Sequence, residues 1–186
     1  MVKLVKTKRF GDDRGWFVET YQRERYTALG IDVEFVQDNH AMSKPAGVLR
    51  GLHFQRPPHA QAKLVRCVRG AIWDVGVDVR AGSPTYGRWL AAELTAENGF
   101  QLFVPAGYAH GYVTLRPDTE VEYKVSGRYA PDCEGGVLWN DPDLALPWPI
   151  PAGGPILSGK DQLLGSLKDF QSPFAYDGAP MPATLD

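Results

Sequence analysis

The sequence predicts an all-β protein, a sandwich or barrel with a few short helices. Short runs rich in Val, Ile, Leu and aromatic residues recur along the 186 residues, and 20 Gly and 15 Pro punctuate them. Several runs alternate apolar and polar side chains, as strands with one buried face do. Many short strands separated by turns are typical of a sandwich or a barrel.

The composition is that of an ordinary globular protein and argues against several classes. The net charge is −2, and no block of Lys or Arg stands out, so we expect no nucleic-acid partner. No apolar run resembles a signal peptide or a membrane span, so we expect no membrane partner. Two cysteines, Cys67 and Cys133, are too few for a disulfide scaffold and indicate free thiols in a reducing cytoplasm.

The first half of the chain predicts one helix and three strands. The helix spans 23–29 and ends at Gly30. The strands are 48–55, 63–69 and 71–79. The third strand alternates cleanly, so we expect one buried side. One face of it carries Ala71, Trp73, Val75, Val77 and Val79, and the other carries Asp74, Gly76 and Asp78.

The second half predicts three more strands, at 89–94, 100–104 and 120–126. Residues 141–155 carry five prolines and two adjacent glycines, which indicates a long ordered loop because proline cannot donate to a sheet. A second helix is expected from 161 to 170. We see no repeat and no linker, and so treat 1–186 as a single domain whose last residues, 172–186, form an irregular tail.

The run Arg50-Gly-Leu-His53 is the first candidate for chemistry. In an extended segment Arg50 and His53 point to opposite faces, and Gly51 allows a bulge or a close approach of the backbone. A lone histidine in a strand is more often a core residue. Taken alone, this run therefore does not identify a site.

The run at 105–111, Pro-Ala-Gly-Tyr-Ala-His-Gly, predicts a turn that leads into a strand with an inward-facing His110. It resembles the second half of the cupin motif, although an ordinary turn explains it equally well. A metal-binding cupin has His-x-His followed by Glu, but here Gln55 replaces the second histidine. His53 and His110 alone do not fill a three-ligand site, so we expect no metal.

Three further features have a structural and a functional interpretation. Tyr123 lies on the apolar side of its strand, where a tyrosine usually only packs. Asp161 follows Lys160 where the second helix is expected to begin; it either caps that helix or orients a histidine. The polar clusters at 12–19 and 37–40 are either surface turns or parts of a nucleotide site.

Taken together, these runs resemble the dTDP-4-dehydrorhamnose 3,5-epimerase family of the cupin superfamily. Each run alone is weak, but their joint order is specific. The match weakens after Leu164, and Ala41-Met42 replaces the serine common in the family. The matching segments are 10–17, 35–40, 49–55, 61–65, 70–80, 105–111, 123–124, 139–142 and 157–161.

The resemblance implies a cupin-type jelly roll (a double-stranded β-helix barrel) and assigns roles. His53 corresponds to the base, Asp161 to its partner, Tyr123 to the acid, and Lys63 to a group beside the ketone. The family is a homodimer whose N-terminal strands, here within 1–45, reach the neighbouring subunit. Substrate contacts are implied at Arg14, Phe17, Glu19, Gln37, Asp38, Asn39, Arg50, His110, Tyr129, Glu134, Trp139 and Lys160.

The implied reaction converts dTDP-4-dehydro-6-deoxyglucose to dTDP-4-dehydrorhamnose, and these residue types suit it. The C–H bonds at C3 and C5 flank a ketone, so a base on one wall and an acid on the other can invert each carbon through an enolate. Histidine titrates near working pH, and a phenol can protonate a far more basic carbon. A lysine stabilises the growing oxyanion. No redox cofactor is needed, and the dinucleotide-binding glycine motif is absent.

Four alternatives remain at this point. The nearest is an epimerase that acts only at C3 or only at C5 of an unusual deoxysugar. The others are a metal-dependent cupin oxygenase, a keto-isomerase cupin, and a non-catalytic module that binds sugar nucleotides. The presence of His53, Tyr123 and Asp161 argues against the last, since a binding module has no need of a base and an acid.

Overall fold

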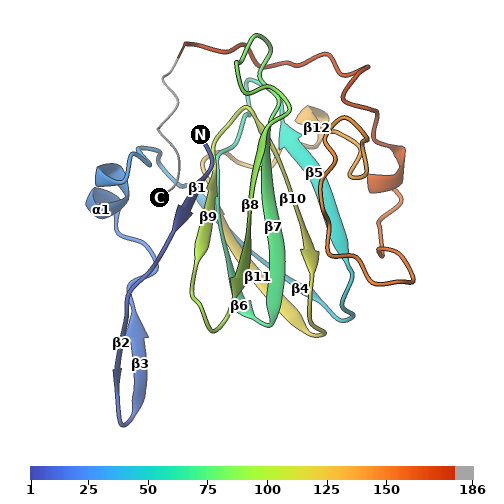
Figure 1. The fold of residues 1–186 in the computed structure, drawn as a ribbon. Helices are drawn as coiled ribbons and strands as arrows, with labels where there is room; N and C mark the ends of the chain where they lie inside the picture. Colours follow the sequence, from blue (N-terminus) through green and yellow to red (C-terminus); the bar gives the residue numbers. More distant parts are fainter. Residues whose placement is uncertain (179–186) are drawn as a thin grey trace.

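The computed structural model describes residues 1–178, which form twelve strands and one α-helix (Figure 1). This confirms the all-β prediction. The strands are β1 (Lys3–Val5), β2 (Arg9–Asp12), β3 (Gly15–Val18), β4 (Gln37–Ser43), β5 (Leu49–Gln55), β6 (Lys63–Arg69), β7 (Ala71–Asp78), β8 (Trp89–Thr95), β9 (Gln101–Val104), β10 (Tyr108–Thr114), β11 (Thr119–Val125) and β12 (Glu134–Gly136).

Ten of these strands form two antiparallel five-stranded sheets. The first sheet has the order β1-β9-β6-β11-β4 and the second the order β12-β5-β10-β7-β8. Apolar side chains from both sheets, among them Val65 and Leu102 of the first and Ile72 and Leu94 of the second, form one buried cluster. The sheets therefore pack face to face. The β2–β3 hairpin projects away from them (Figure 1).

Strand β7 corrects one prediction, because both of its faces are buried. The alternation itself is as expected, but Val75 and Val77 pack in a cluster with Leu144 and Phe174 of the C-terminal segment. The opposite face, which carries Asp74 and Gly76, turns toward the other sheet: a Cβ on Gly76 would lie 2.7 Å from Val2 and 3.2 Å from Val104. The polar face of this strand therefore lies inside the barrel.

The two predicted helices have different outcomes. The first is confirmed as α1 (Arg23–Ala28), whose Tyr26 packs in a cluster with Leu64 and Phe103 on the first sheet. The second is wrong: only a 3₁₀ turn, η2 (Asp161–Leu163), is present, and Leu164 is already extended. Gly165 follows directly, and glycine disfavours continuation of a helix. A second 3₁₀ turn, η1 (Pro131–Cys133), precedes β12.

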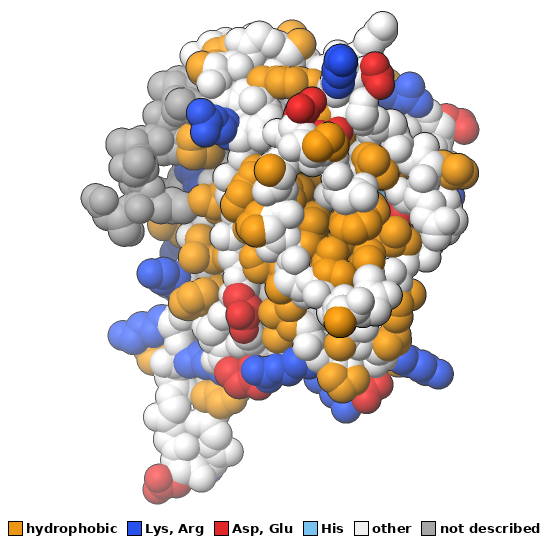
Figure 2. All heavy atoms as spheres, turned by 45° about the vertical axis from the view of Figure 1, so that its right-hand side comes forward, with side chains coloured by type: hydrophobic (Ala, Val, Ile, Leu, Met, Phe, Trp, Pro, Cys, Tyr) orange, Lys and Arg blue, Asp and Glu red, His pale blue; other side chains and the backbone are white. Residues whose placement is uncertain are grey.

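The C-terminal segment covers the outer face of the second sheet. The expected long loop is confirmed, since 141–155 contains no helix or strand. Trp148 of this loop packs its ring 4.8 Å from that of Trp73 on β7. Figure 2 views the molecule from this side and shows apolar side chains gathered on the surface. The C-terminal segment thus shields from solvent the outer face of the second sheet.

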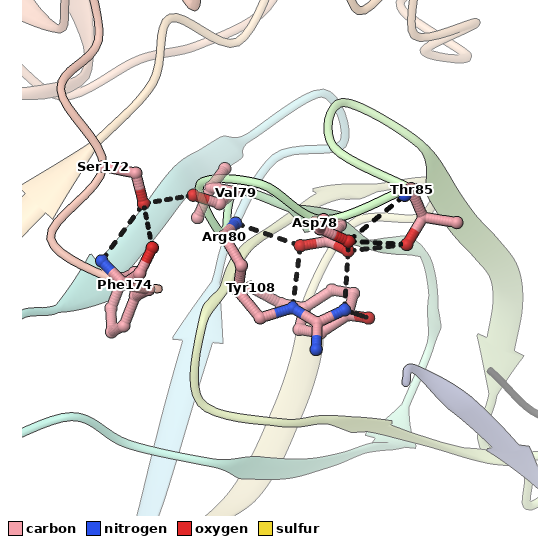
Figure 3. A network of polar contacts seen from close by, with 8 residues as sticks. Asp78, Val79, Arg80, Thr85, Tyr108, Ser172 and Phe174 are labelled. Carbon is pink, nitrogen blue, oxygen red and sulfur yellow. Dashed lines mark hydrogen bonds and ion pairs between the residues drawn. The ribbon is translucent and has the colours of Figure 1, made fainter. Parts of the chain in front are cut away.

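A polar network ties the chain after β7 to the C-terminal segment (Figure 3). Asp78 accepts two hydrogen bonds from the Arg80 guanidinium, at 2.9 and 2.6 Å, and further ones from Ser83 and Thr85. Ser172 donates to the carbonyl of Val79. Of the predicted tail 172–186, the described part 172–178 holds no helix or longer strand, although Phe174 is buried. Residues 179–186 lie outside the described residues.

Asp78→Asn is expected to destabilise the protein by about 2 kcal/mol at pH 7. Burial alone would raise the pKa of Asp78, but hydrogen bonds from Arg80, Ser83 and Thr85 lower it to about 2, below its ordinary value of 3.8. The stability that this shift contributes is complete above about pH 4 and is lost as pH falls through about 2. Thermal melts of both proteins from pH 7 to 3 should therefore converge as the pH falls. Asp13→Asn, at an exposed site, is the control and should melt like the native protein. Equal melting temperatures of Asp78→Asn and the native protein at pH 7 would contradict the prediction.

Candidate active site

A bulge in β5 places the two candidate residues of this strand in one cavity. His110 of β10 pairs with His53, but Tyr112 pairs with Arg50, so β5 has one residue more than β10 between these pairs. The extra residue corrects the expectation that Arg50 and His53 point to opposite faces, since both line the same cavity. Only glycine fits at position 51, where φ is +124° and a Cβ would lie 2.6 Å from Gly111.

The cavity has a volume of about 390 Å³ and is walled by both sheets and the C-terminal segment. The first sheet contributes Lys63 from β6 and Tyr123 from β11. The second sheet contributes Arg50, His53, His110 and Tyr112, and the C-terminal segment contributes Ser158 and Asp161. The structure therefore brings a histidine and a tyrosine from opposite sheets to one hollow.

His53 and Asp161 form a close pair, with 2.6 Å between Nε2 of the ring and Oδ1 of the carboxylate. The carboxylate is 2% exposed and also accepts a hydrogen bond from the hydroxyl of Ser158 at 2.7 Å. Burial alone would raise the pKa of Asp161, but the hydrogen bonds from His53 and Ser158 lower it to about 2. At neutral pH an ionised carboxylate thus holds the imidazole in a fixed orientation.

A short bridge between two distant segments of the chain explains how Asp161 reaches His53. Ile156 forms a parallel bridge with Val48, and its carbonyl accepts a hydrogen bond from the amide of Leu49. The segment after Ile156 therefore runs beside the start of β5. Asp161 lies at the first residue of η2, one short turn beyond this bridge.

Lys63 brings a positive charge to the cavity without a fixed partner. The described residues form neither a hydrogen bond nor an ion pair with its ammonium group. Burial lowers the pKa of Lys63 to about 8, against the attraction of the Asp74 and Glu134 carboxylates. The amine is still mostly protonated at pH 7, so it can donate to an oxygen of a bound molecule.

Two phenols also line the cavity. Burial raises the pKa of Tyr123, against the opposing influence of the Arg50 guanidinium. Tyr112 has a raised pKa for the same reasons and lies deeper, with 4% of its surface exposed. Both hydroxyls therefore remain protonated at neutral pH, and Tyr123 packs on the apolar core as the alternation of its strand predicts.

Four of the expected substrate contacts line a second cavity that is also bounded by His53, Lys63 and Tyr123 and has a volume of about 180 Å³. These contacts are Gln37, Asn39, Tyr129 and Glu134. Lys160 joins this group, because its ammonium lies 2.9 Å from the carboxylate of Glu134. The two cavities share three residues, so a ligand longer than a single sugar can span both.

The remaining expected contacts do not reach these cavities within this chain. Asp38 alternates with Gln37 and Asn39 on β4 and so lies on the other face, paired with Lys124 at 2.9 Å. Trp139 lines none of the cavities that contain His53. Its carbonyl accepts a hydrogen bond from the indole of Trp148.

The N-terminal candidates are similarly remote. Arg14 lies at the hairpin turn and is paired with Asp12, and Phe17 is 68% exposed on β3. Glu19 follows β3 and pairs with Arg25 at 2.6 Å. The projection of the hairpin away from the sheets accounts for this separation (Figure 1).

The sequence interpretation missed Asp74, which is fully buried and lies 2.7 Å from Nε2 of His110. Burial raises the pKa of Asp74 and lowers that of His110. The signal that could have found it is the run of polar and small residues on one face of 71–79. No group of three potential metal ligands occurs in residues 1–178. No helix among the same residues is long and apolar enough to cross a membrane.

Comparisons with known proteins show the family to which the chain belongs. The model of the family described as dTDP-4-dehydrorhamnose 3,5-epimerase matches residues 1–169. A relative of that name from Sinorhizobium fredii is 49% identical over 175 residues, which cover 94% of this chain and 89% of the relative. These matches extend over nearly the whole chain.

Two solved structures are similar over a comparable length. The dTDP-4-dehydrorhamnose 3,5-epimerase of Bacillus anthracis, with TDP and PPi bound, is 50% identical, with a TM-score of 0.85 and coverage of 89% of this chain and 93% of its own. A 3,5-epimerase of Legionella pneumophila in complex with dTDP-4-keto-L-rhamnose is 40% identical, with a TM-score of 0.89 and coverage of 94% and 93%. These scores confirm the cupin-type jelly roll that the sequence predicts.

Proposed function

Because the chain belongs to the dTDP-4-dehydrorhamnose 3,5-epimerase family, we propose that it converts dTDP-4-dehydro-6-deoxyglucose to dTDP-4-dehydrorhamnose by inverting C3 and C5. The observation that carries this proposal is the shared cavity. The His53–Asp161 pair lies on one side, Tyr123 belongs to the opposite sheet, and the Lys63 ammonium has no hydrogen-bond or ion-pair partner within residues 1–178. A base, an acid and an oxyanion donor thus surround one space.

Each inversion then consists of two proton transfers. The ring nitrogen of His53 that does not contact Asp161 takes the proton from C3 or C5, and the electron pair of the C–H bond moves toward the ketone oxygen. Lys63 stabilises the negative charge on that oxygen. The Tyr123 hydroxyl returns a proton to the same carbon from the other face, and both side chains recover their starting states by exchange with water. The reaction only moves protons, so the scheme requires no cofactor.

The second cavity is proposed to hold the nucleotide. Gln37 and Asn39 offer amide groups to a thymine base, and Tyr129 offers an aromatic ring beside Glu134. Arg50 lines the first cavity and is suited to a phosphate oxygen, since guanidinium groups bind phosphates strongly. In this proposal the sugar lies against His53 and the diphosphate lies between the two cavities.

A homodimer is proposed as the working form. The hairpin exposes three large aromatic side chains, Phe10, Trp16 and Phe17, at 52, 60 and 68%. Exposed apolar groups on a projecting element are typical of an interface. Arg14, Phe17 and Glu19 would then serve the partner's site. Sedimentation of a monomer at assay concentrations would contradict this.

We place the protein in the cytoplasm, in line with its two free cysteines. Cys67 is buried and Cys133 is partly buried, and neither forms a disulfide. Unpaired cysteines persist in a reducing compartment.

Incubation with dTDP-4-dehydro-6-deoxyglucose in deuterated water tests the function. We expect deuterium at both C3 and C5 of the sugar and inversion of both centres, because each carbon loses its proton to His53 and gains one that has exchanged with solvent. NMR of the isolated product measures both. Label at only one carbon would instead support an epimerase of single specificity, and no label at all would support a module that only binds.

A further inference from the structure

A second imidazole–carboxylate pair lies in the wall of the same cavity. Asp74 is completely buried on the inner face of β7, and its Oδ1 lies 2.7 Å from Nε2 of His110. The ring of His110 borders the cavity near Lys63. The mechanism proposed above uses neither member of this pair.

The other oxygen of Asp74, Oδ2, is buried and has no hydrogen-bond partner among the described residues. Buried carboxylates in proteins are normally paired or fully hydrogen-bonded. Lys63 is close enough to influence the pair but forms no ion pair with it. Complete burial therefore disfavours a full negative charge on Asp74, although His110, Lys63 and the backbone of Val75 act in its favour.

The pair therefore keeps the proton that would cancel this charge. Burial favours the neutral form of both members, since it raises the pKa of Asp74 and lowers that of His110. Lys63 and His53 also oppose a positive charge on the His110 ring. The proton lies either on the carboxyl group or on Nε2. In both arrangements Nδ1 of His110 carries a hydrogen atom.

We propose that Asp74 is a positioning residue of the epimerase, which shares one proton with His110 and so fixes the ring with Nδ1–H as a donor to the substrate. Together with Lys63 this N–H stabilises the oxygen of the enolate. This assignment rests on the proposed function for the identity of the oxygen. It gives the cavity a second donor that does not depend on the ionisation of an amine.

NMR of the full chain labelled with ¹⁵N-histidine tests the protonation state directly and needs no substrate. The chain has four histidines, and loss of one signal in His110→Gln identifies the ring of interest. We expect Nδ1 to carry a proton throughout about pH 6 to 8. A ring with Nε2–H and a bare Nδ1 in this range would overturn the proposal.

Two substitutions test the consequence for catalysis. In Asp74→Asn a neutral partner remains, and its amide can donate to Nε2, so we expect kcat within about 10-fold of the native value and an unchanged pH profile. Asp74→Leu removes the hydrogen bond, and we expect kcat to fall about 100-fold while KM changes less. Asp78→Asn, at a buried aspartate of the same strand outside the cavity, is the control and should keep native kcat below its melting temperature.

The outcomes separate a positioning role from a structural one. A folded Asp74→Leu with native kcat, or a shifted pH profile in Asp74→Asn, would contradict the proposal. If Asp74→Leu does not fold, as circular dichroism will show, the Asn variant and the ¹⁵N signals decide. If the native protein fails to exchange protons of the sugar, the proposed function is wrong, whereas the state of the His110 ring is still settled by the NMR measurement.

Discussion

His53→Asn is expected to lower kcat by about 10⁴-fold, because it removes the base that accepts the proton from the sugar. The amide of asparagine can still donate to Asp161, so the buried carboxylate keeps a partner and the fold should persist. Deuterium incorporation from solvent and formation of the inverted sugar measure the loss together. Both should fall in parallel, because each requires the proton to leave the carbon first.

The matched control is His59→Asn, at an exposed histidine on the turn after β5. This variant should retain native activity. If His53→Asn exchanged the protons of the substrate at the native rate, another group would have to be the base. Circular dichroism and the melting temperature of His53→Asn exclude the trivial explanation of an unfolded protein.

Tyr123→Phe is expected to separate proton exchange from inversion. His53 can still remove the proton and return one to the same face, so deuterium should enter with retention of configuration. Inversion should fall by about 10²- to 10³-fold, because the opposite face has lost its acid, while KM changes little. The hydroxyl is removed without loss of the ring that packs on the core. Stereochemical analysis of the labelled sugar distinguishes the two reactions.

Tyr86→Phe, in the loop between β7 and β8, serves as the control and should invert normally. Native inversion by Tyr123→Phe would remove Tyr123 from the mechanism. Loss of exchange and inversion to the same extent would mean that Tyr123 holds the substrate and does not deliver the proton.

Six strands, β5 to β9 and β11, could be predicted from the sequence because alternation and turn residues are local properties. The face that each strand buries is not local. Val75 and Asp74 alternate as expected, but both are buried, because a segment some 70 residues later covers the outer face. Gly51 indicated a possible bulge or close approach, but its effect on Arg50 and His53 depends on the pairing of β5 with β10 and could not be predicted.

The site shows the same division. The family resemblance supplied His53, Tyr123, Lys63 and Asp161, and the structure brings all four to one cavity. The resemblance did not distinguish Asn39, which lines the second cavity, from Asp38, which faces away. Which of the two side chains faces the cavity is decided by the pairing of β4 with β11. The resemblance assigned no role to Asp74, and its contact with His110 depends on the pairing of β7 with β10, which the sequence pattern does not show.

The position of Asp161 on the C-terminal segment has a consequence for biosynthesis. Both sheets are complete by residue 136, yet the carboxylate that pairs with His53 comes later and approaches from outside the barrel. A nascent chain that has left the ribosome only as far as β12 therefore lacks one wall of the cavity and half of the dyad. Catalytic competence is acquired only after the last covering segment has been translated and has docked.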